Sequence, residues 1–319
     1  PAYQYSKNGI DYQASNVFNG LGPNTYTIYI KDANNCTNSD VTTVNEPLPL
    51  TIVGESRNDN NLCYGDSLGE ISIDRVTGGI SPYTYSIDGG STFHSNSTFT
   101  NLPAGSYASA VRDDNGCIAY GNPGIVINQP DSIEISSYSQ VDVLGCYGDA
   151  TGLISIEAIG GTGLKEFSLD GATPVSPGNF NGLTGGFYTI TISDINACEK
   201  DTTVFIDQPA KLIFTSVTLT HITSCNGDAS GEISLTSGGG TGIHAYAIDG
   251  GSFQGSATFS GLTAGDHTLS VKDANDCQID TIVTLNEPEP LSIASIDSVD
   301  IKCYGENNGS ITVAANGGT

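Results

Sequence analysis

Short stretches of the chain alternate apolar with polar residues, which is the pattern of a β-strand with one buried face. Gly, Asn, Asp and Pro bound these stretches, and no long segment repeats with the 3.6-residue period of a helix. The pattern therefore predicts an all-β chain of short strands. Its clearest examples are Tyr26/Ile28/Ile30, Tyr188/Ile190/Ile192 and His267/Leu269/Val271.

The strands recur because the chain repeats itself. An Asp-containing signature that ends in cysteine occurs four times, with its cysteines 81, 81 and 79 residues apart, at Cys36, Cys117, Cys198 and Cys277. A second signature, Cys-(Tyr/Asn)-Gly-(Asp/Glu), opens at Cys63, Cys146, Cys225 and Cys303. Each second signature precedes an alternating apolar pair and then a Gly-Gly pair. Because the spacing of these signatures is nearly constant, each repeat is predicted to fold as one module.

Module boundaries are predicted at four proline-containing junctions, at residues 45–47, 128–130, 207–209 and 286–288. Several short strands per repeat of about 80 residues predict immunoglobulin-like β-sandwich modules. Because the linkers are short and stiffened by proline, we expect the modules to follow end to end as a rod. The predicted parts are the C-terminal part of a module at 1–47, complete modules at 48–130, 131–209 and 210–288, and the N-terminal part of a module at 289–319. Both ends fall within the same internal turn, so we expect the polypeptide to continue in both directions.

The amino-acid composition limits the kinds of partner that such a repeat array can bind. The formal net charge is −25, from 35 acidic and 10 basic residues. Nucleic-acid binding needs clustered Lys and Arg, so this class of partner is excluded. No apolar run approaches the ~18 residues of a membrane span, so we expect no membrane insertion. The expected partners are neighbouring modules of the same chain, surface glycans or other fibre chains.

The eight cysteines lie two per repeat, which in an oxidising compartment indicates one bridge per module. Such a bridge would stabilise a thin core. Two alternatives stay open. In a strict sandwich the two cysteines of a module lie at opposite ends, so the bridge could instead join neighbouring modules, as in Cys63–Cys198. The shorter and equally regular spacing from Cys117 to Cys146 is the other possible pairing. The absence of a Cys-x-x-Cys motif argues against zinc. The preferred pairs are Cys63–Cys117, Cys146–Cys198 and Cys225–Cys277, with Cys36 and Cys303 paired outside this stretch.

An Asp-x-Asn element before each cysteine of the first signature has two interpretations. Hard oxygen ligands in an acidic chain suit calcium. The same residues also form Asx turns, in which the side chains bind their own backbone. We favour the turn, because no local run supplies the ~6–8 oxygens that calcium takes. The candidates are Asp32/Asn34, Asp113/Asn115, Asp194/Asn196 and Asp273/Asn275.

No catalytic set recurs, so we expect no enzyme. The four histidines occupy different repeat positions and are interpreted as surface or strand-lining residues: His94, His221, His244 and His267. The Gly-Gly pairs lack the following Lys-Ser/Thr and helix of a phosphate-binding loop, so they are interpreted as turns. Recurring aromatic residues are expected in the core. Those beside the second-signature cysteine, at Tyr64, Tyr147 and Tyr304, are candidates for module junctions or sugar contacts.

Taken together, the two signatures, the Gly-Gly pair and the intervening Phe-x-x-Leu resemble the SprB-type repeat. That repeat builds very large surface adhesins of Bacteroidota, including the gliding-motility adhesin. The resemblance implies export by the type IX secretion system, a cell-surface location, and a role in adhesion or gliding. It also implies O-glycosylation at Asp-(Ser/Thr) sites. The matching positions are Ser67, Ser132, Thr202, Thr281 and Ser298.

The predicted function is therefore the structural or adhesive shaft of a bacterial extracellular surface fibre. The alternatives are a carbohydrate- or protein-binding repeat array, a filament-forming surface protein, or an accessory region of a secreted hydrolase. A binding array would present the same exposed aromatic cluster in every copy. A hydrolase would need a catalytic domain elsewhere in the polypeptide.

Overall fold

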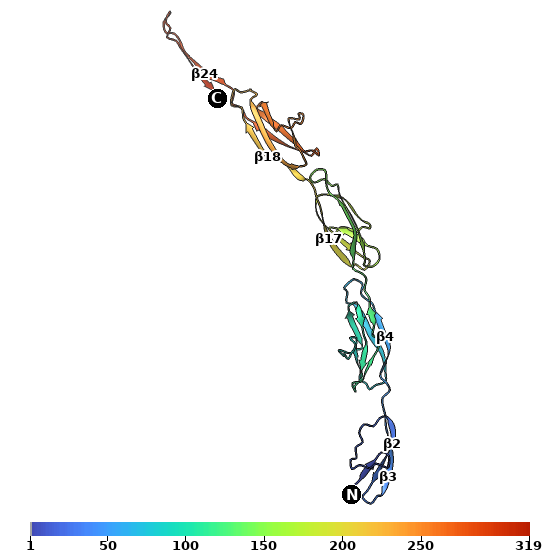
Figure 1. Ribbon diagram of the computed structural model, residues 1–319. Helices are drawn as coiled ribbons and strands as arrows, with labels where there is room; N and C mark the ends of the chain where they lie inside the picture. Colours follow the sequence, from blue (N-terminus) through green and yellow to red (C-terminus); the bar gives the residue numbers. More distant parts are fainter. Residues whose placement is uncertain (1) are drawn as a thin grey trace. The chain divides into compact units, whose positions relative to one another are not determined.

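The computed structural model describes residues 2–319, and within them the secondary structure is β-strand without helix (Figure 1). The prediction of an all-β chain is confirmed. The chain divides into two compact units, residues 1–132 and 133–319. The described residues contain no helix long and apolar enough to cross a membrane.

The unit 133–319 contains two sets of six strands with the same order. In each set the first, second and fourth strands form one antiparallel sheet, and the third, fifth and sixth form another. The first set is β12 (Glu134–Val141), β13 (Gly152–Ile159), β14 (Glu166–Leu169), β15 (Gly178–Leu183), β16 (Gly186–Ser193) and β17 (Glu199–Ile206). The second is β18 (Ala210–Thr220), β19 (Gly231–Gly240), β20 (Ala245–Ile248), β21 (Thr258–Leu262), β22 (Gly265–Lys272) and β23 (Gln278–Leu285).

Period-two alternation places the core between the two sheets of each set. Ile154 and Ile156 of β13 are buried, and so are Ile190 and Ile192 of β16. Leu269 and Val271 of β22 are fully buried in the same way. Successive side chains of a strand point to opposite faces, and Ser155 and Thr191 between these pairs are more exposed, whereas Ser270 between Leu269 and Val271 is buried as well. The alternation predicted for these two strands is thus confirmed.

The unit 1–132 contains a third set in which the second sheet is split. The first sheet is β4-β5-β7, while the second divides into β6-β9-β10 and β8-β11. Asn122-Pro123-Gly124 interrupts the last strand between β10 and β11, because proline has no N–H to donate to the ladder. The bounds are β4 (Thr51–Asn58), β5 (Gly69–Thr77), β6 (Thr84–Ser86), β7 (Thr98–Leu102), β8 (Gly105–Tyr107), β9 (Ala110–Arg112), β10 (Ile118–Tyr120) and β11 (Ile125–Ile127).

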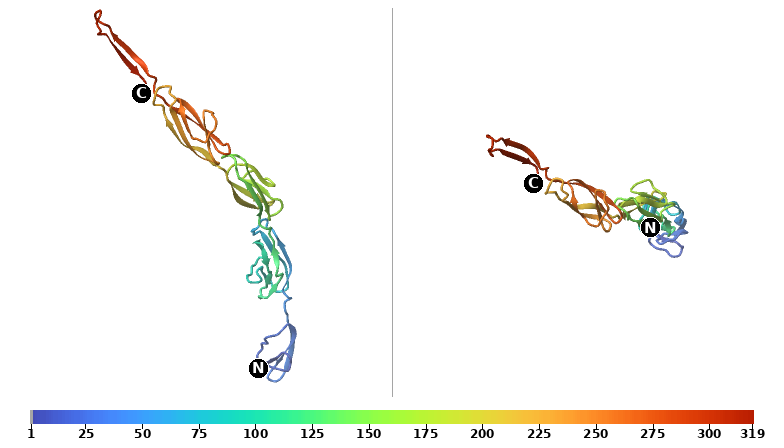
Figure 2. Two further views of the ribbon diagram at one scale, coloured as in Figure 1. Left: turned by 45° about the horizontal axis from the view of Figure 1, so that its top comes forward. Right: turned by 90° about the horizontal axis from the view of Figure 1, so that it is seen from above.

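Two parts of the chain form single-layered sheets. Near the N-terminus, β1 (Gln4–Ser6), β2 (Asn24–Lys31) and β3 (Thr37–Val44) pair side by side. Near the C-terminus, β24 (Ser292–Val299) and β25 (Ser310–Asn316) form a hairpin (Figure 2). The alternation predicted a buried face for β2, yet Ile30 is 37% exposed. A pattern predicts which face is apolar, but burial needs an opposing sheet, and none covers β2 within the described residues.

The Gly-Gly pairs 78–79 and 160–161 lie in bends, as predicted, whereas the pair 239–240 forms the end of strand β19. Both glycines of the pair 239–240 have positive φ, +75° and +62°. At Gly239 a Cβ atom would lie 1.9 Å from the backbone oxygen of Lys211 in the strand that begins the module. The pair is thus needed for the left-handed backbone and for this close approach.

Candidate functional site

Each second signature folds into a tight turn, which we call the exit turn because it lies beside the end of its module. In the exit turn 146–149, the Asp149 N–H donates to the Cys146 carbonyl at 3.0 Å. The Cys146 N–H in turn donates to Asp149 Oδ2 at 2.6 Å. Gly148 has φ +85°, the left-handed conformation that the third position of a type II turn requires. This explains why glycine holds that position in all four copies.

The linker residue before the proline fixes the exit turn to the end of the module. Gly148 N–H donates to Gln208 Oε1 at 3.0 Å, and Val143 N–H donates to the Asp207 carbonyl at 2.9 Å. The same bond occurs in the other complete copies, from Gly65 to Gln129 and from Gly227 to Glu287. Sequence reasoning interpreted these junctions only as stiff boundaries and missed this anchoring role of Gln or Glu.

The first signature folds into a second element, which we call the docking loop. In the docking loop 273–277, Asp273 Oδ1 accepts the N–H groups of Asn275 and Cys277 at 2.8 and 3.0 Å. Asp273 Oδ2 accepts the Thr241 N–H at 2.8 Å, which joins the loop to the Gly-Gly turn. Burial raises the pKa of Asp273, but these N–H donors outweigh it and hold the pKa below its ordinary value. Asp273 is therefore an ionised anchor of the loop.

The aspartates among the calcium candidates occupy this same position in each copy. Asp113 and Asp194 bind the backbone as Asp273 does, accepting the N–H of Ile80 and of Thr162 respectively with one oxygen. Their other oxygen accepts the N–H of the cysteine four residues later. These are the Asx turns that we favoured.

The same geometry places Asn115 and Asn196 inside these turns. The Asn196 N–H donates to Asp194 Oδ1 at 2.8 Å. The backbone of Ile80 and, more weakly, that of Asn115 donate to Asp113 and hold the pKa of its carboxyl below the ordinary value. Backbone N–H groups donate to both carboxylate oxygens of these aspartates, and within residues 2–319 no cluster of three His, Cys, Asp or Glu residues could hold a metal ion. Asn115 and Asn196 lie in these turns, and calcium binding by them stays a prediction.

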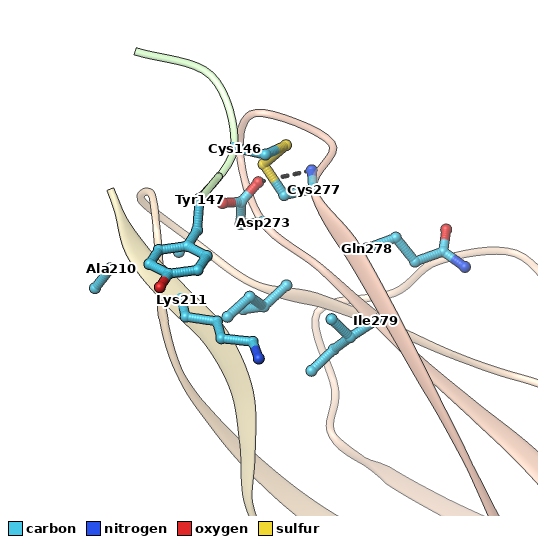
Figure 3. A pocket seen from close by; sticks show the side chains of 10 residues that line it. Cys146, Tyr147, Ala210, Lys211, Asp273, Cys277, Gln278 and Ile279 are labelled. Carbon is cyan, nitrogen blue, oxygen red and sulfur yellow. Dashed lines mark hydrogen bonds between the residues drawn. A yellow bond between two sulfur atoms is a disulfide. The ribbon is translucent and has the colours of Figure 1, made fainter. Parts of the chain in front are cut away.

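In the unit 133–319, an exit turn and a docking loop meet and are bonded covalently. Cys146 of the predicted module 131–209 forms a disulfide with Cys277 of the predicted module 210–288, with their Cα atoms 5.5 Å apart (Figure 3). Asn275 Nδ2 donates to the carbonyls of Leu144 and Gly145 at 2.7 and 3.1 Å. A small pocket beside the bridge is lined by Tyr147, Ala210, Lys211 and Leu212 among others. Tyr147 therefore lies at the module junction, one of the two positions expected for it.

This bridge overturns the preferred cysteine pairing. Cys146 does not pair with Cys198, and Cys277 does not pair with Cys225, because Cys146 and Cys277 pair with each other. Cys63–Cys117 is wrong as well, since Cys117 is free and exposed, as are Cys225, Cys36 and Cys303. The shorter Cys117–Cys146 spacing fails for the same reason. Cys63 and Cys198 are each disulfide-bonded.

The physical reason lies in the strand directions. Cys146 stands beside Gln208 at the end of its module, whereas Cys198 follows Asp194, which is bound to the Gly-Gly turn at the other end. An extended strand of eight residues, such as β13, separates those ends by about 26 Å. Disulfides need Cα atoms within about 7 Å. The open alternative, a bridge between neighbouring modules, is the one realised at Cys146–Cys277.

Asn275→Ala is expected to weaken this junction without unfolding either module. It removes the two hydrogen bonds to Leu144 and Gly145, worth about 1 kcal/mol together because both carbonyls are exposed to water. The equilibrium for forming Cys146–Cys277 should fall roughly fivefold, measured by titration in glutathione redox buffer. Gln254→Ala is the matched control, since its amide donates to the Ser256 carbonyl within its own module and it does not line the junction pocket. An equal shift in both variants would contradict the assignment.

His267 takes the place of a tyrosine that ties the start of the fifth strand to the preceding loop. Tyr26, Tyr107 and Tyr188 each donate their hydroxyl to the carbonyl four residues earlier, at 2.8–2.9 Å. His267 makes the same contact through Nε2, 2.9 Å from the Thr263 carbonyl, while Nδ1 lies 2.7 Å from Asp249 Oδ2. Both nitrogens face acceptors, an arrangement that favours the doubly protonated ring. The strand-lining interpretation holds, but its role as a tyrosine substitute was missed.

The stability of residues 210–288 is therefore expected to fall as the pH rises above neutral. Hydrogen bonds to Thr263 and Asp249 raise the pKa of His267 above its ordinary 6.5, against the opposing effect of burial, and the charges of Asp249 and Asp266 add to them. When a histidine has a higher pKa in the folded than in the unfolded protein, its contribution to the free energy of unfolding is complete below the unfolded pKa of about 6.5. That contribution is lost as the pH rises through the folded-state pKa. Burial raises the Asp249 pKa, but the bonds to His267 and Thr268 lower it overall, so the carboxylate's contribution is lost only in acid.

The test is thermal unfolding of the chain across this pH range. His267→Tyr should keep the bond to Thr263 and remove the decline above neutral, because tyrosine titrates near 10. Tyr188→Phe loses the equivalent bond without adding a titrating group, so it should lower stability equally at every pH. A decline that persists in His267→Tyr would assign the pH dependence to another group.

The predicted glycosylation positions lie in unlike surroundings. Ser67 and Ser298 are exposed, whereas Ser132, Thr202 and Thr281 are half-buried. Their modification stays a prediction.

Comparison with known proteins assigns the repeat. The family model described as "SprB repeat" matches residues 58–92, 223–253 and 295–319. Each match contains one exit turn and the Gly-Gly turn that follows it. Three stretches of the chain thus match the SprB repeat. The docking loops lie outside the matched stretches, so the junction at Cys146–Cys277 uses residues beyond the part that the family model matches. A search among curated proteins finds no match.

Several solved structures of tandem domains are similar at low identity. Extracellular domains 3–5 of Drosophila OTK are 10% identical, covering 65% of this chain and 86% of that one, with a TM-score of 0.24. A tetra-tandem repeat from the extending region of a large adhesion protein is 13% identical, covering 89% and 91%, with a TM-score of 0.23. The S-layer protein rSbsC(31-844) is 13% identical, covering 99% and 59%, with a TM-score of 0.22. TM-scores this low do not establish a shared fold, so no inference rests on them.

Proposed function

We propose that the chain is a repeat region of an extracellular surface protein. Its SprB repeats carry mechanical load between the cell and the surface to which the cell adheres. The observation that supports this most directly is the covalent junction. The polypeptide already joins successive modules, and the disulfide adds a second covalent path, so that a pulling force bypasses the residues between Cys146 and Cys277. Asn275 and the exit turn hold the same two modules in place around the bridge.

The chemistry of the chain supports an extracellular setting. Disulfides persist outside the cytosol, where glutathione does not reduce them. A net charge of −25 keeps a long array soluble and self-repelling. The described residues offer neither a metal cluster nor a recurring nucleophile beside a base, so we propose a structural, non-enzymatic role. Gliding motility, type IX secretion and glycan partners stay predictions of the SprB resemblance.

Single-molecule pulling on the whole chain tests the mechanical role. Cys146 and Cys277 are 131 positions apart in the sequence, a stretch that spans up to about 45 nm when fully extended. Residues enclosed by a bridge bear no load, so the oxidised chain should extend tens of nanometres less than the reduced chain. A chain whose full length is released in both states would overturn the load-bearing junction. Labelling of intact cells by an antibody to the chain tests the surface location independently.

A further inference from the structure

The outer face of the sheet β12-β13-β15 carries a shallow cavity of about 250 Å³. Residues that pair across an antiparallel sheet point to the same face, so the register places two rows of side chains side by side across the three strands. One row is polar and the other mainly apolar. The first consists of Ser139, Ser155 and Asn179, and the second of Val141, Leu153 and Asn181. From strand geometry the two rows cover about 10 by 7 Å, which is close to the area of one six-membered sugar ring.

The polar side chains of this cavity have hydrogen-bonding groups to spare. Ser155 Oγ donates to Asn179 Oδ1 at 2.8 Å, which leaves the NH₂ group of that amide to donate elsewhere. The side-chain amide of Asn181 makes no hydrogen bond to the residues that the structure describes. Both asparagines are exposed, so a ligand that lies across the two rows meets donors and acceptors together.

The apolar part of the cavity distinguishes this module from the two other complete ones. Val141 and Leu153 pair across the sheet and are 47% and 43% exposed. Single exposed apolar residues need no explanation, but two in register beside unpaired amides form a patch. The equivalent pairs in the other modules are polar and acidic, and so the same face offers no such patch there. These pairs are Asn58 with Glu70, and Thr220 with Glu232.

Charge limits the kind of ligand. Every residue that lines the cavity is uncharged, although the chain as a whole has a net charge of −25. Next to the polar row, Glu157 accepts the Ser137 hydroxyl at 3.1 Å, and its carboxylate repels an approaching anion. The cavity therefore favours a neutral ligand that combines an apolar face with several hydroxyl groups.

We propose that this cavity binds a neutral sugar unit of a glycan. An apolar C–H face of the sugar ring lies on Val141 and Leu153, and the ring hydroxyls exchange hydrogen bonds with Asn179, Asn181 and Ser139. An apolar floor with a few placed polar groups is the usual composition of a small-molecule site. Drug-sized ligands take cavities of about 300–1,000 Å³, so 250 Å³ is suited to a single ring. Because the cavity is shallow, the neighbouring units of the glycan can extend from it in both directions.

This site adds sugar recognition to the proposed load-bearing role and does not depend on it. The six residues of the two rows all lie between Ser139 and Asn181, within one module. Sugar binding should therefore be the same in the oxidised chain and in a chain with serine at both Cys146 and Cys277. A failed pulling experiment would leave the sugar site standing, and a failed binding experiment would leave the load-bearing junction standing.

Affinity electrophoresis of the full chain tests the site, in gels that contain dextran, mannan or galactan as neutral glycans and alginate as an anionic one. At least one neutral glycan should retard the chain, and alginate should not. Leu153→Glu introduces the residue of the other two modules and should weaken the retardation at least tenfold. Thr220→Glu adds the same charge at the equivalent face of residues 210–288 and should leave the retardation unchanged. Asn181→Ala should also weaken it, without a cost to folding, because that amide has no partner in the protein.

Transfer of the site to the next module gives the complementary test. Placing the four residues of this cavity at their equivalents in residues 210–288 should raise the number of sugar sites per chain from one to two, counted by calorimetric titration with an oligosaccharide of the retarding glycan. The substitutions are Thr220→Val, Glu232→Leu, Thr258→Asn and Ser260→Asn. Retardation by none of the three neutral glycans, retardation by alginate alone, or an equal loss in Leu153→Glu and Thr220→Glu would overturn the proposal.

Discussion

Replacing both Cys146 and Cys277 with serine is expected to lower the free energy of unfolding of residues 210–288 by roughly 2–4 kcal/mol. While residues 131–209 stay folded, Cys146 is held beside Gln208, where the next module begins. The bridge therefore closes the unfolded stretch 210–277 into a loop. Closing a loop of that size removes about 4 kcal/mol of chain entropy from the unfolded state, and measured values are often smaller.

Hydrogen exchange read by mass spectrometry measures this loss module by module. Protection of the buried strands β19 and β22 should fall by the same free energy in the double variant and in the reduced chain. Cys225→Ser is the control, because Cys225 is a free, exposed thiol in an equivalent exit turn. If Cys225→Ser destabilised the same strands equally, loss of the cysteine side chain rather than of the bridge would be the cause.

Local sequence pattern was sufficient for the strands but not for the connections between modules. Tyr188, Ile190 and Ile192 were correctly assigned to one face of a strand, because alternation is a property of consecutive residues. The partner of Cys146 is 131 residues away in another module, so no local pattern specifies it. The strand directions contained the missing information: a cysteine before β13 and one after β16 lie a strand length apart. The distance between these two ends constrains the bridge more strongly than the count of two cysteines per module does.

At the candidate site, too, the sequence predicted the local turns but not the contacts between modules. The Asp-x-Asn elements were favoured as Asx turns from their residue types alone, and Asp273 binds its own backbone in that way. The contact of Asn275 with Leu144 and Gly145 was not predictable, since it depends on which module lies opposite. His267 could have been recognised by alignment, because Tyr26, Tyr107 and Tyr188 hold the same repeat position. Its pairing with Asp249 needed the structure.

Gly239→Ala is expected to destabilise residues 210–288 by roughly 2–5 kcal/mol, the second large effect. Part of the cost is backbone strain, because Gly239 has φ +75° and a non-glycine residue there costs about 1–2 kcal/mol. The larger part is steric. The new Cβ would lie 1.9 Å from the Lys211 oxygen and 2.7 Å from its carbonyl carbon, which are backbone atoms that cannot turn away. The start of β18 must shift instead.

Gly227→Ala separates these two costs. Gly227 has φ +86°, but a Cβ there would meet nothing within 4 Å, so this variant suffers the strain alone and should lose only about 1–2 kcal/mol. Calorimetric unfolding of both variants gives the difference, which measures the close approach to Lys211. Because Lys211 also lines the junction pocket beside Cys277, Gly239→Ala should reduce the yield of Cys146–Cys277 on oxidation. Equal destabilisation of the two variants would mean that the Gly-Gly pair is kept for its backbone conformation and not for contact with the strand that begins the module.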